Sequence, residues 1–282
     1  MSSKTKLVIK IIICSIILIV LIFLYSRYIN SMGFKVKEYT IYNNELPKEY
    51  DGFKIVHISD IHYGVSIKKK ELSNIVDKIN LTKPDIVVLT GDLLDNNTSY
   101  KKSDIDDIIK QLNKIECSIE KYAIAGNNDY SNQDWQNIID SSNFINLNDS
   151  YELIYKSKTP LLISGLSTND NNNNLNDKIR KTNDYLKDNN LYSILIMHEP
   201  DEIKNIDYSK FNLILAGHSH GGQIRLPIIG GLIVKDGSKK YINEYYKLDN
   251  TDLYVSNGLS NSSIKYRFFN KPSFSLYRLR NK

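Results

Sequence analysis

The chain has 282 residues, of which 41% are hydrophobic and 24% are charged, and its formal net charge is +5. A chain of this length can bury a core without disulfides, and no dense basic stripe interleaved with aromatic residues indicates nucleic acid as a partner. Two cysteines, Cys14 and Cys117, are too few for a disulfide framework, and neither belongs to a metal-binding cluster.

The N-terminus carries an apolar run over residues 7–25, with Lys10 as its single charge. As a helix rising about 1.5 Å per residue, this run reaches about 28 Å, close to the ~30 Å hydrocarbon core of a bilayer. We expect residues 1–32 to form a membrane anchor with a short linker, and residues 33–282 to form one large domain. A cleaved signal peptide is the main alternative, but such peptides have a shorter apolar core and an A-x-A cleavage pattern.

The orientation of this anchor follows from its flanks. Basic residues are nearly balanced on the two sides of the run, so the positive-inside rule decides little. Because a short N-terminus before a first span commonly stays inside, we expect a single-pass cell-membrane protein whose large domain, residues 33–282, lies on the outer face.

Short apolar runs alternate with helical patterns along the rest of the chain. The runs predict strands at 54–58, 85–89, 122–125, 193–197, 213–216, 253–256 and 274–279. Helical spacing predicts helices around 72–79 and 105–112, the second capped by Ser103. An Asn-rich stretch, 169–176, predicts a surface loop. Strands separated by helices predict an α/β fold, with a mixed sheet because the second half is richer in strands.

Five of these strands end at a polar cluster. The clusters are Ser59-Asp60-Ile61-His62, Gly91-Asp92, Gly126-Asn127-Asn128-Asp129, His198-Glu199 and Gly217-His218-Ser219-His220. The carboxyl ends of strands form the ligand crevice in open α/β sheets, so we expect these residues to meet at one edge. His57 lies inside the first of the strands and is interpreted as structural.

The clusters supply a mixed set of oxygen and nitrogen ligands. They hold two carboxylates, four imidazoles and one amide oxygen, namely Asp60, Asp92, His62, His198, His218, His220 and Asn127. Such ligands suit Mn, Fe or Zn better than Ca or a thiolate zinc site. Seven ligands exceed the need of one ion, whereas two divalent ions about 3.5–4 Å apart can share a carboxylate, clamp a phosphate and activate a water. Each cluster alone has ordinary structural uses, and the prediction depends on the ordered set.

The ordered set resembles the calcineurin-like metallophosphoesterase superfamily, whose blocks are D-x-H, GD-x-x-D, GNH-[DE], a lone H and GH-x-H. The bacterial membrane-associated, YkuE-like branch of this superfamily is resembled in three places. These are the sequences around residues 52–60 and 217–223 and the C-terminal tail with Arg267 and Pro272. The resemblance implies a four-layer α/β/β/α sandwich with two mixed sheets, preceded here by one transmembrane helix.

The resemblance also implies a role for each ligand. One ion would be held by Asp60, His62 and His220, the other by Asn127, His198 and His218, and Asp92 would bridge them. A hydroxide shared by the two metals would then attack phosphorus. The expected activity is phosphoester hydrolysis of the phosphodiesterase, phosphatase or pyrophosphatase type, near the membrane, on a substrate of lipid-linked or envelope origin.

Asn128 departs from the family pattern, which has His at this catalytic position. Asn can donate a hydrogen bond but cannot act as a general acid, and losing such an acid costs typically ~10²–10⁴-fold in rate. This departure favours substrates with good leaving groups. It also leaves open a membrane-anchored, metal-binding pseudoenzyme or scaffold with little turnover. A two-metal amide hydrolase is a third hypothesis, which the order of the blocks disfavours.

Overall fold

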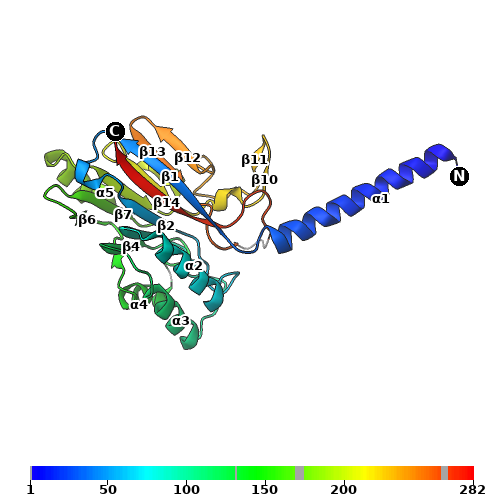
Figure 1. Cartoon of the computed structure of the whole chain (residues 1–282), viewed down its shortest axis with the longest axis horizontal. Coiled ribbons are helices and arrows are strands. Elements are labelled where there is room, and N and C mark those ends of the chain that lie inside the picture. The colour runs from blue at the N-terminus through cyan, green and yellow to red at the C-terminus, as the bar shows by residue number, and fades with distance from the viewer. Residues whose placement is uncertain (1, 131, 169–174, 262–265) are drawn as a thin grey trace.

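The computed structural model describes residues 2–130, 132–168, 175–261 and 266–282. It begins with helix α1 (Ser3–Leu24), continued by a π-helical turn (Tyr25–Ile29), and the pair extends away from the rest of the protein (Figure 1). No side chain of α1 is buried, and the continuous helix Ser3–Ile29 is long and apolar enough to cross a membrane.

The first sheet has six strands in the order β1-β14-β2-β3-β4-β5. These are β1 (Lys35–Asn43), β14 (Ser273–Asn281), β2 (Lys54–Ile58), β3 (Ile86–Thr90), β4 (Glu120–Ile124) and β5 (Ile145–Asn146). Strands β2 to β5 run parallel, and β14 joins β2 antiparallel. Helices α2 (Lys69–Thr82), α3 (Lys102–Leu112) and α4 (Gln133–Ser141) cover its outer face (Figure 1).

The second sheet has the order β12-β13-β9-β8-β7-β6. Its strands are β12 (Tyr245–Leu248), β13 (Thr251–Val255), β9 (Leu213–Ala216), β8 (Ser193–Met197), β7 (Leu161–Leu166) and β6 (Ser150–Ile154). The four central strands are parallel, and the two edge strands are antiparallel to their neighbours. Helix α5 (Leu175–Asp188) and a 3₁₀ segment (Pro200–Asn205) pack on its outer face. A small hairpin, β10 (Arg225–Leu226) and β11 (Gly230–Gly231), lies outside both sheets.

Three apolar layers hold this sandwich together. Along β2, Val56 packs toward the helices while Ile55 packs toward the second sheet, and Leu89 and Val88 of β3 divide in the same way. A third cluster joins the second sheet to α5. Strands buried on both faces tend to have apolar sequences, and this pattern located β2, β3, β8 and β9. Strand β7 is buried along its whole length but was not predicted, because Ser164 and Gly165 interrupt its apolar run. The predicted four-layer α/β/β/α sandwich is confirmed.

Two of the sequence-based expectations were wrong in detail. Helix α3 begins at Lys102, and the Asp104 carboxylate accepts a 2.9 Å hydrogen bond from the Lys101 N–H, so the helix is capped before Ser103. Of the expected Asn-rich loop, residues 169–174 lie outside the described residues, and Asn176 belongs to α5.

Candidate metal centre

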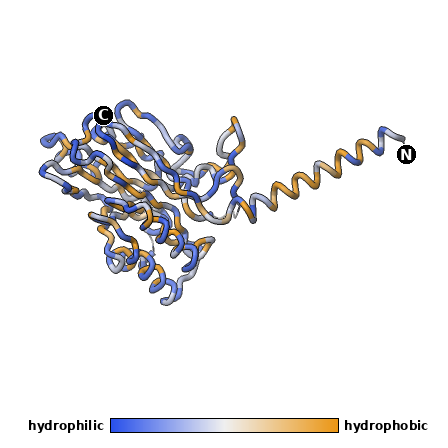
Figure 2. The backbone as a smooth tube through the Cα atoms, in the orientation of Figure 1, coloured by the Kyte–Doolittle hydropathy of each residue, from blue (hydrophilic) through white to orange (hydrophobic). Residues whose placement is uncertain are grey.

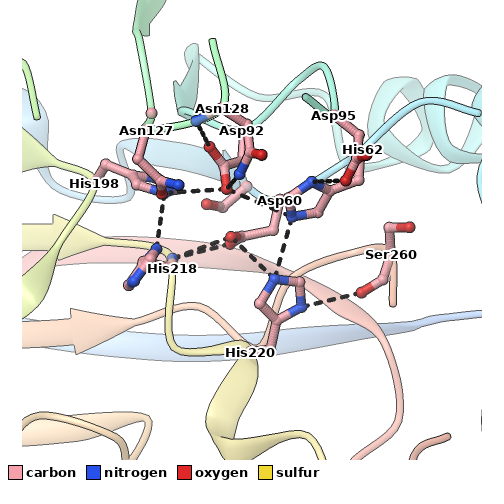
Figure 3. A network of polar contacts seen from close by, with 12 residues as sticks. Asp60, His62, Asp92, Asp95, Asn127, Asn128, His198, His218, His220 and Ser260 are labelled. Atoms are coloured by element: carbon pink, nitrogen blue, oxygen red, sulfur yellow. Dashed lines mark hydrogen bonds and ion pairs between the residues drawn. The ribbon is translucent and has the colours of Figure 1, made fainter. Parts of the chain in front are cut away.

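The polar residues at the strand ends come together where the two sheets meet. Asp60 and His62 follow β2, Asp92 follows β3 and Asn127 follows β4, all from the first sheet. His198 follows β8, and His218 and His220 follow β9 of the second sheet. Figure 3 shows all seven side chains around one centre, as the parallel strands predicted.

Six of the seven residues fall into two groups of three buried side chains. In the first group, Nε2 of His220 lies 3.3 Å from Nε2 of His62 and 3.4 Å from Oδ1 of Asp60. In the second, Nε2 of His198 lies 3.2 Å from Nδ1 of His218.

Asp92 lies between the two groups. Its Oδ2 is 3.3 Å from Nε2 of His198 in its own group and 3.5 Å from Nε2 of His62 in the other. The seventh residue, Asn127, is exposed, and its Oδ1 lies 3.1 Å from Nε2 of His198. A single carboxylate oxygen therefore faces both imidazole sets.

In each imidazole, the ring nitrogen that points away from the centre, here called the outer nitrogen, faces an oxygen acceptor. The pairs are His198 Nδ1 with Thr90 O at 2.6 Å, His218 Nε2 with Asp236 O at 2.6 Å, His220 Nδ1 with Ser260 O at 3.1 Å, and His62 Nδ1 with Asp95 Oδ2 at 3.4 Å. A proton on the outer nitrogen leaves the inner nitrogen with its lone pair free. Metal-binding histidines in proteins are held by partners of this kind.

The spacing of the inner atoms fits shared cations. Two ligands about 2.0–2.2 Å from one ion lie about 3–3.5 Å apart at ordinary coordination angles. The separations of 3.2–3.5 Å within and between the groups match this value. Two imidazole lone pairs that face each other repel unless a proton or a cation lies between them, so the residues present fit a pair of metal ions.

The pKa of His198 is shifted in the opposite direction from the pKa values of His218 and His220. Burial disfavours the charge on His198, yet the nearby Asp92 raises its pKa to about 10, and His198 holds the pKa of Asp92 well below its usual range. Burial lowers the pKa of His218 to about 4, and burial also lowers the pKa of His220 well below its ordinary value. At neutral pH, His218 and His220 are therefore ready to bind a cation, which would displace a proton from His198.

Backbone strain is concentrated in the same residues. A positive φ is uncommon for a non-glycine residue and costs about 1–3 kcal/mol, so it persists where the surroundings enforce it. Five of the seven predicted ligands have one, at values of 52° for Asp60, 39° for His62, 53° for Asp92, 65° for His218 and 46° for His220. The backbone therefore turns sharply after β2, β3 and β9, where these five residues lie.

Two glycines allow the loops to approach each other. A Cβ on Gly91 would lie 2.4 Å from the backbone nitrogen of Gly126, and a Cβ on Gly126 would lie 2.4 Å from Oδ1 of Asp92. Real Cβ contacts are not that short, so glycine is required at both positions. This requirement explains the glycine in front of both Asp92 and Asn127.

Asn128 and Asp129 connect the same two loops. Nδ2 of Asn128 donates to Oδ2 of Asp92 at 2.7 Å, and its backbone N–H donates to Oδ1 at 2.9 Å. Asp129 is buried, and its carboxylate accepts three backbone N–H groups, those of Leu93, Leu94 and Gly126. Burial, and next the charge of Asp92, raises the pKa of Asp129 to about 7. Asn128 thus contacts the carboxylate that joins the two groups.

The sequence analysis assigned no role at the site to several supporting residues, although it had noted Arg267 in the C-terminal tail. Arg267 is fully buried, and its Nη2 lies 3.2 Å from Nδ1 of His220 and donates to the Ser260 carbonyl at 2.6 Å. Thr90 and Asp236 contribute their backbone carbonyls, so their side chains give no indication of the role.

His57, interpreted as structural, is fully buried in β2 with Nε2 2.7 Å from Oγ1 of Thr90, and burial lowers its pKa to about 3.

Comparisons with known proteins give a consistent result. The family model described as "Calcineurin-like phosphoesterase" matches residues 53–222. The chain is 33% identical over 269 residues to the "Uncharacterized metallophosphoesterase YkuE" of Bacillus subtilis (strain 168), covering 91% of this chain and 89% of that protein. It is 24% identical over 255 residues to a "Transmembrane protein with metallophosphoesterase domain" of Danio rerio, covering 86% of this chain and 56% of that one. The solved structure of the calcineurin-like phosphoesterase YfkN of Bacillus subtilis is 12% identical with a TM-score of 0.47, covering 77% of this chain and 88% of that one.

Proposed function

The chain belongs to the calcineurin-like phosphoesterase family, and from this premise we propose that it is a two-metal phosphoester hydrolase that acts at a membrane. The observation that carries the proposal is the position of Asp92, whose Oδ2 lies 3.5 Å from Nε2 of His62 and 3.3 Å from Nε2 of His198. One carboxylate oxygen shared by two imidazole sets is what a pair of neighbouring cations requires.

The ligands divide between the two ions as follows. Asp60, His62 and His220 hold one ion, while His198, His218 and Asn127 hold the other, with Asp92 common to both. When bound, two divalent ions of Mn, Fe or Zn supply Lewis-acid polarisation of the phosphate and a water acidic enough to ionise near neutral pH. The protein's own contribution is orientation, because each imidazole is fixed from behind by an oxygen acceptor.

Asn128 limits the choice of substrate. Its side-chain nitrogen donates to Asp92 at 2.7 Å, so the residue orients that carboxylate. An amide cannot protonate a departing alkoxide. We therefore infer that the enzyme favours bonds whose leaving group departs without a proton, such as aryl esters and pyrophosphates.

Residues 1–32 serve as an uncleaved single-pass anchor with its linker, and residues 33–282 form the catalytic domain, which lies on the outer face of the cell membrane. The support is the apolar helix over Ser3–Ile29, in which no side chain of the part Ser3–Leu24 is buried. In a Cys14→Ser, Cys117→Ser background, a membrane-impermeant maleimide should label Ser103→Cys in intact cells, whereas Ser2→Cys should react only after lysis. The reverse pattern would place the domain inside.

A metal-binding pseudoenzyme remains the second candidate, and the specific observation in its favour is Asn128 at the usual His position. Turnover separates the two. The full-length protein in detergent, loaded with Mn²⁺, should hydrolyse bis-p-nitrophenyl phosphate, and Asp92→Asn should lose at least about 10²-fold of that rate. Asp106→Asn, the same chemical change at an exposed residue of α3, is the control and should keep the rate. Metal binding without turnover in the wild type would favour the scaffold.

A further inference from the structure

Exposed apolar side chains gather around the β10–β11 hairpin. Among the described residues after Met32, the large aliphatic and phenylalanine side chains that are exposed are Leu81, Ile228, Ile229, Leu232, Val234 and Phe269. All but Leu81 belong to the hairpin region or, in the case of Phe269, to the groove of about 680 Å³ that the hairpin lines. Ile228, at the tip, is fully exposed. Single exposed apolar residues are ordinary, but a cluster of this kind marks a contact surface.

This apolar surface is continuous with the membrane helix. The backbone N–H of Arg267 donates to the Ser26 carbonyl at 3.2 Å, and the Ser26 hydroxyl donates to the Arg267 carbonyl at 2.9 Å. The ring of Tyr25 packs edge-on against Phe268, which in turn contacts the ring of Phe269. The Arg225 N–H donates to the Phe268 carbonyl at 2.9 Å, which attaches the hairpin to the same segment.

The pictures agree with these contacts. In Figure 1 the hairpin projects from the body of the protein on the side where α1 leaves it. Figure 2 shows apolar colour along α1 and again at the tip of the hairpin. A bilayer that contains α1 therefore passes close to the hairpin.

The hairpin is also attached to the metal centre at both ends. Its chain leaves directly from His220 through Gly221 and Gly222, and the guanidinium of Arg225 donates to the Gly221 carbonyl at 2.9 Å. On its return the segment reaches Asp236, whose carbonyl lies 2.6 Å from Nε2 of His218. Apart from Phe269, the apolar surface and the two histidines thus belong to one short stretch of chain.

We propose that Ile228, Ile229, Leu232, Val234 and Phe269 form a second membrane-contact surface, which rests in the interfacial layer of the bilayer that holds α1. This inference depends on the proposed anchor role of α1. Two points of attachment fix the orientation of the domain, so the metal centre is held beside the lipid headgroups. The substrate class that this position favours is a phosphoester carried on a lipid.

The test measures the depth of the hairpin tip in vesicles directly. The full-length chain is reconstituted into phosphatidylcholine–phosphatidylglycerol vesicles with an environment-sensitive fluorophore on a single cysteine. Ile228→Cys is the probe, in a Cys14→Ser, Cys117→Ser background. Leu81→Cys is the matched control, because this exposed aliphatic residue near the end of α2 lies just before β3 begins, at the edge opposite the metal centre. Native Cys14 within α1, with Cys117→Ser, reports on the anchor.

Nitroxide-labelled lipids should quench the probes at 228 and at Cys14 at least threefold more than the probe at 81. Quenching at Cys14 with no excess at 228 would overturn the membrane-contact surface and leave the anchor intact. A blue-shifted but unquenched probe at 228 would also overturn it, in favour of a protein partner. Absence of quenching at Cys14 would contradict both the proposed membrane anchor and the membrane-contact surface that depends on it.

A second readout depends on the proposed activity. The double change Ile228→Ser with Ile229→Ser should lower turnover of a vesicle-borne aryl phosphate lipid at least fivefold. Turnover of water-soluble bis-p-nitrophenyl phosphate should stay within twofold of the wild type. Equal losses on both substrates would assign the residues to folding and contradict the proposal, while inactivity of the wild type on both would reject the hydrolase function without affecting the quenching result.

Discussion

At the scale of single residues, Asn128 stands where the resemblance to the family pattern leads us to expect His. Replacing it by His would restore a group able to protonate a leaving alkoxide, so the rate on an alkyl phosphodiester should rise by ~10-fold or more. The rate on an aryl diester, whose leaving group needs no proton, should change little. Steady-state kcat for the two substrates is the measurement, with Asn250→His on an exposed turn as control. A parallel change on both substrates would contradict this role.

His57 makes stability depend on pH. Its folded pKa is about 3 against an ordinary 6.5, so the contribution to stability is complete above about pH 6.5 and is lost as pH falls toward 3. Between pH 7 and pH 5 this residue should cost the wild type about 2 kcal/mol of unfolding free energy. His57→Gln cannot titrate and should lose that much less over the same interval in urea denaturation. Identical pH slopes for the two proteins would show that His57 is not held neutral.

At the scale of elements, the loops that follow β3 and β4 work as one unit joined by Asp129. Asp129→Ala would leave the buried N–H groups of Leu93, Leu94 and Gly126 without their acceptor, and the free energy of unfolding should fall by about 2–4 kcal/mol. The metal content should fall as well, since Asp92 and Asn127 lie on these loops. Denaturant midpoints and elemental analysis measure the two effects. Asp106→Ala on the exposed face of α3 is the control, and an equal, small effect of both changes would contradict the linkage.

The elements that supply ligands could be predicted because they are buried on both faces. Strands β3, β8 and β9 are apolar along nearly their whole length, while β2 and β4 are mostly apolar after a charged start, and a polar cluster follows each of the five. Strands β1, β6 and β12 are edge strands with mixed burial, so their residues gave no clear pattern. Helices α4 and α5 were missed for a similar reason, as their apolar stripes hold few residues.

Of the candidate site, only the seven ligand positions could be predicted from the sequence, and the residues that support them could not. The seven ligand positions form an ordered set, but Ser260 supports His220 through a backbone carbonyl forty positions along the chain, and no side chain reports such a role. The burial of Arg267 beside His220 depends equally on the folded chain. The contact between Ser26 and Arg267 joins residues 241 positions apart, so the place of the hairpin beside the membrane helix could not be derived from local pattern.

At the scale of the whole molecule, the sandwich brings together the carboxyl ends of the parallel strands of its two mixed sheets. One carboxylate lies between the ligands that the two sheets supply. Asp92 comes from the first sheet, while His198, His218 and His220 come from the second. The centre therefore exists only when both sheets are packed through the shared apolar layer between them.

The most direct measurement is electron paramagnetic resonance of the full-length protein titrated with Mn²⁺. A pair of ions joined through Asp92 should give two bound Mn²⁺ per chain and the multiline spectrum of an exchange-coupled pair, and Asp92→Asn should abolish that coupling. A spectrum of isolated Mn²⁺ in the wild type, or coupling that survives Asp92→Asn, would contradict the shared-carboxylate centre.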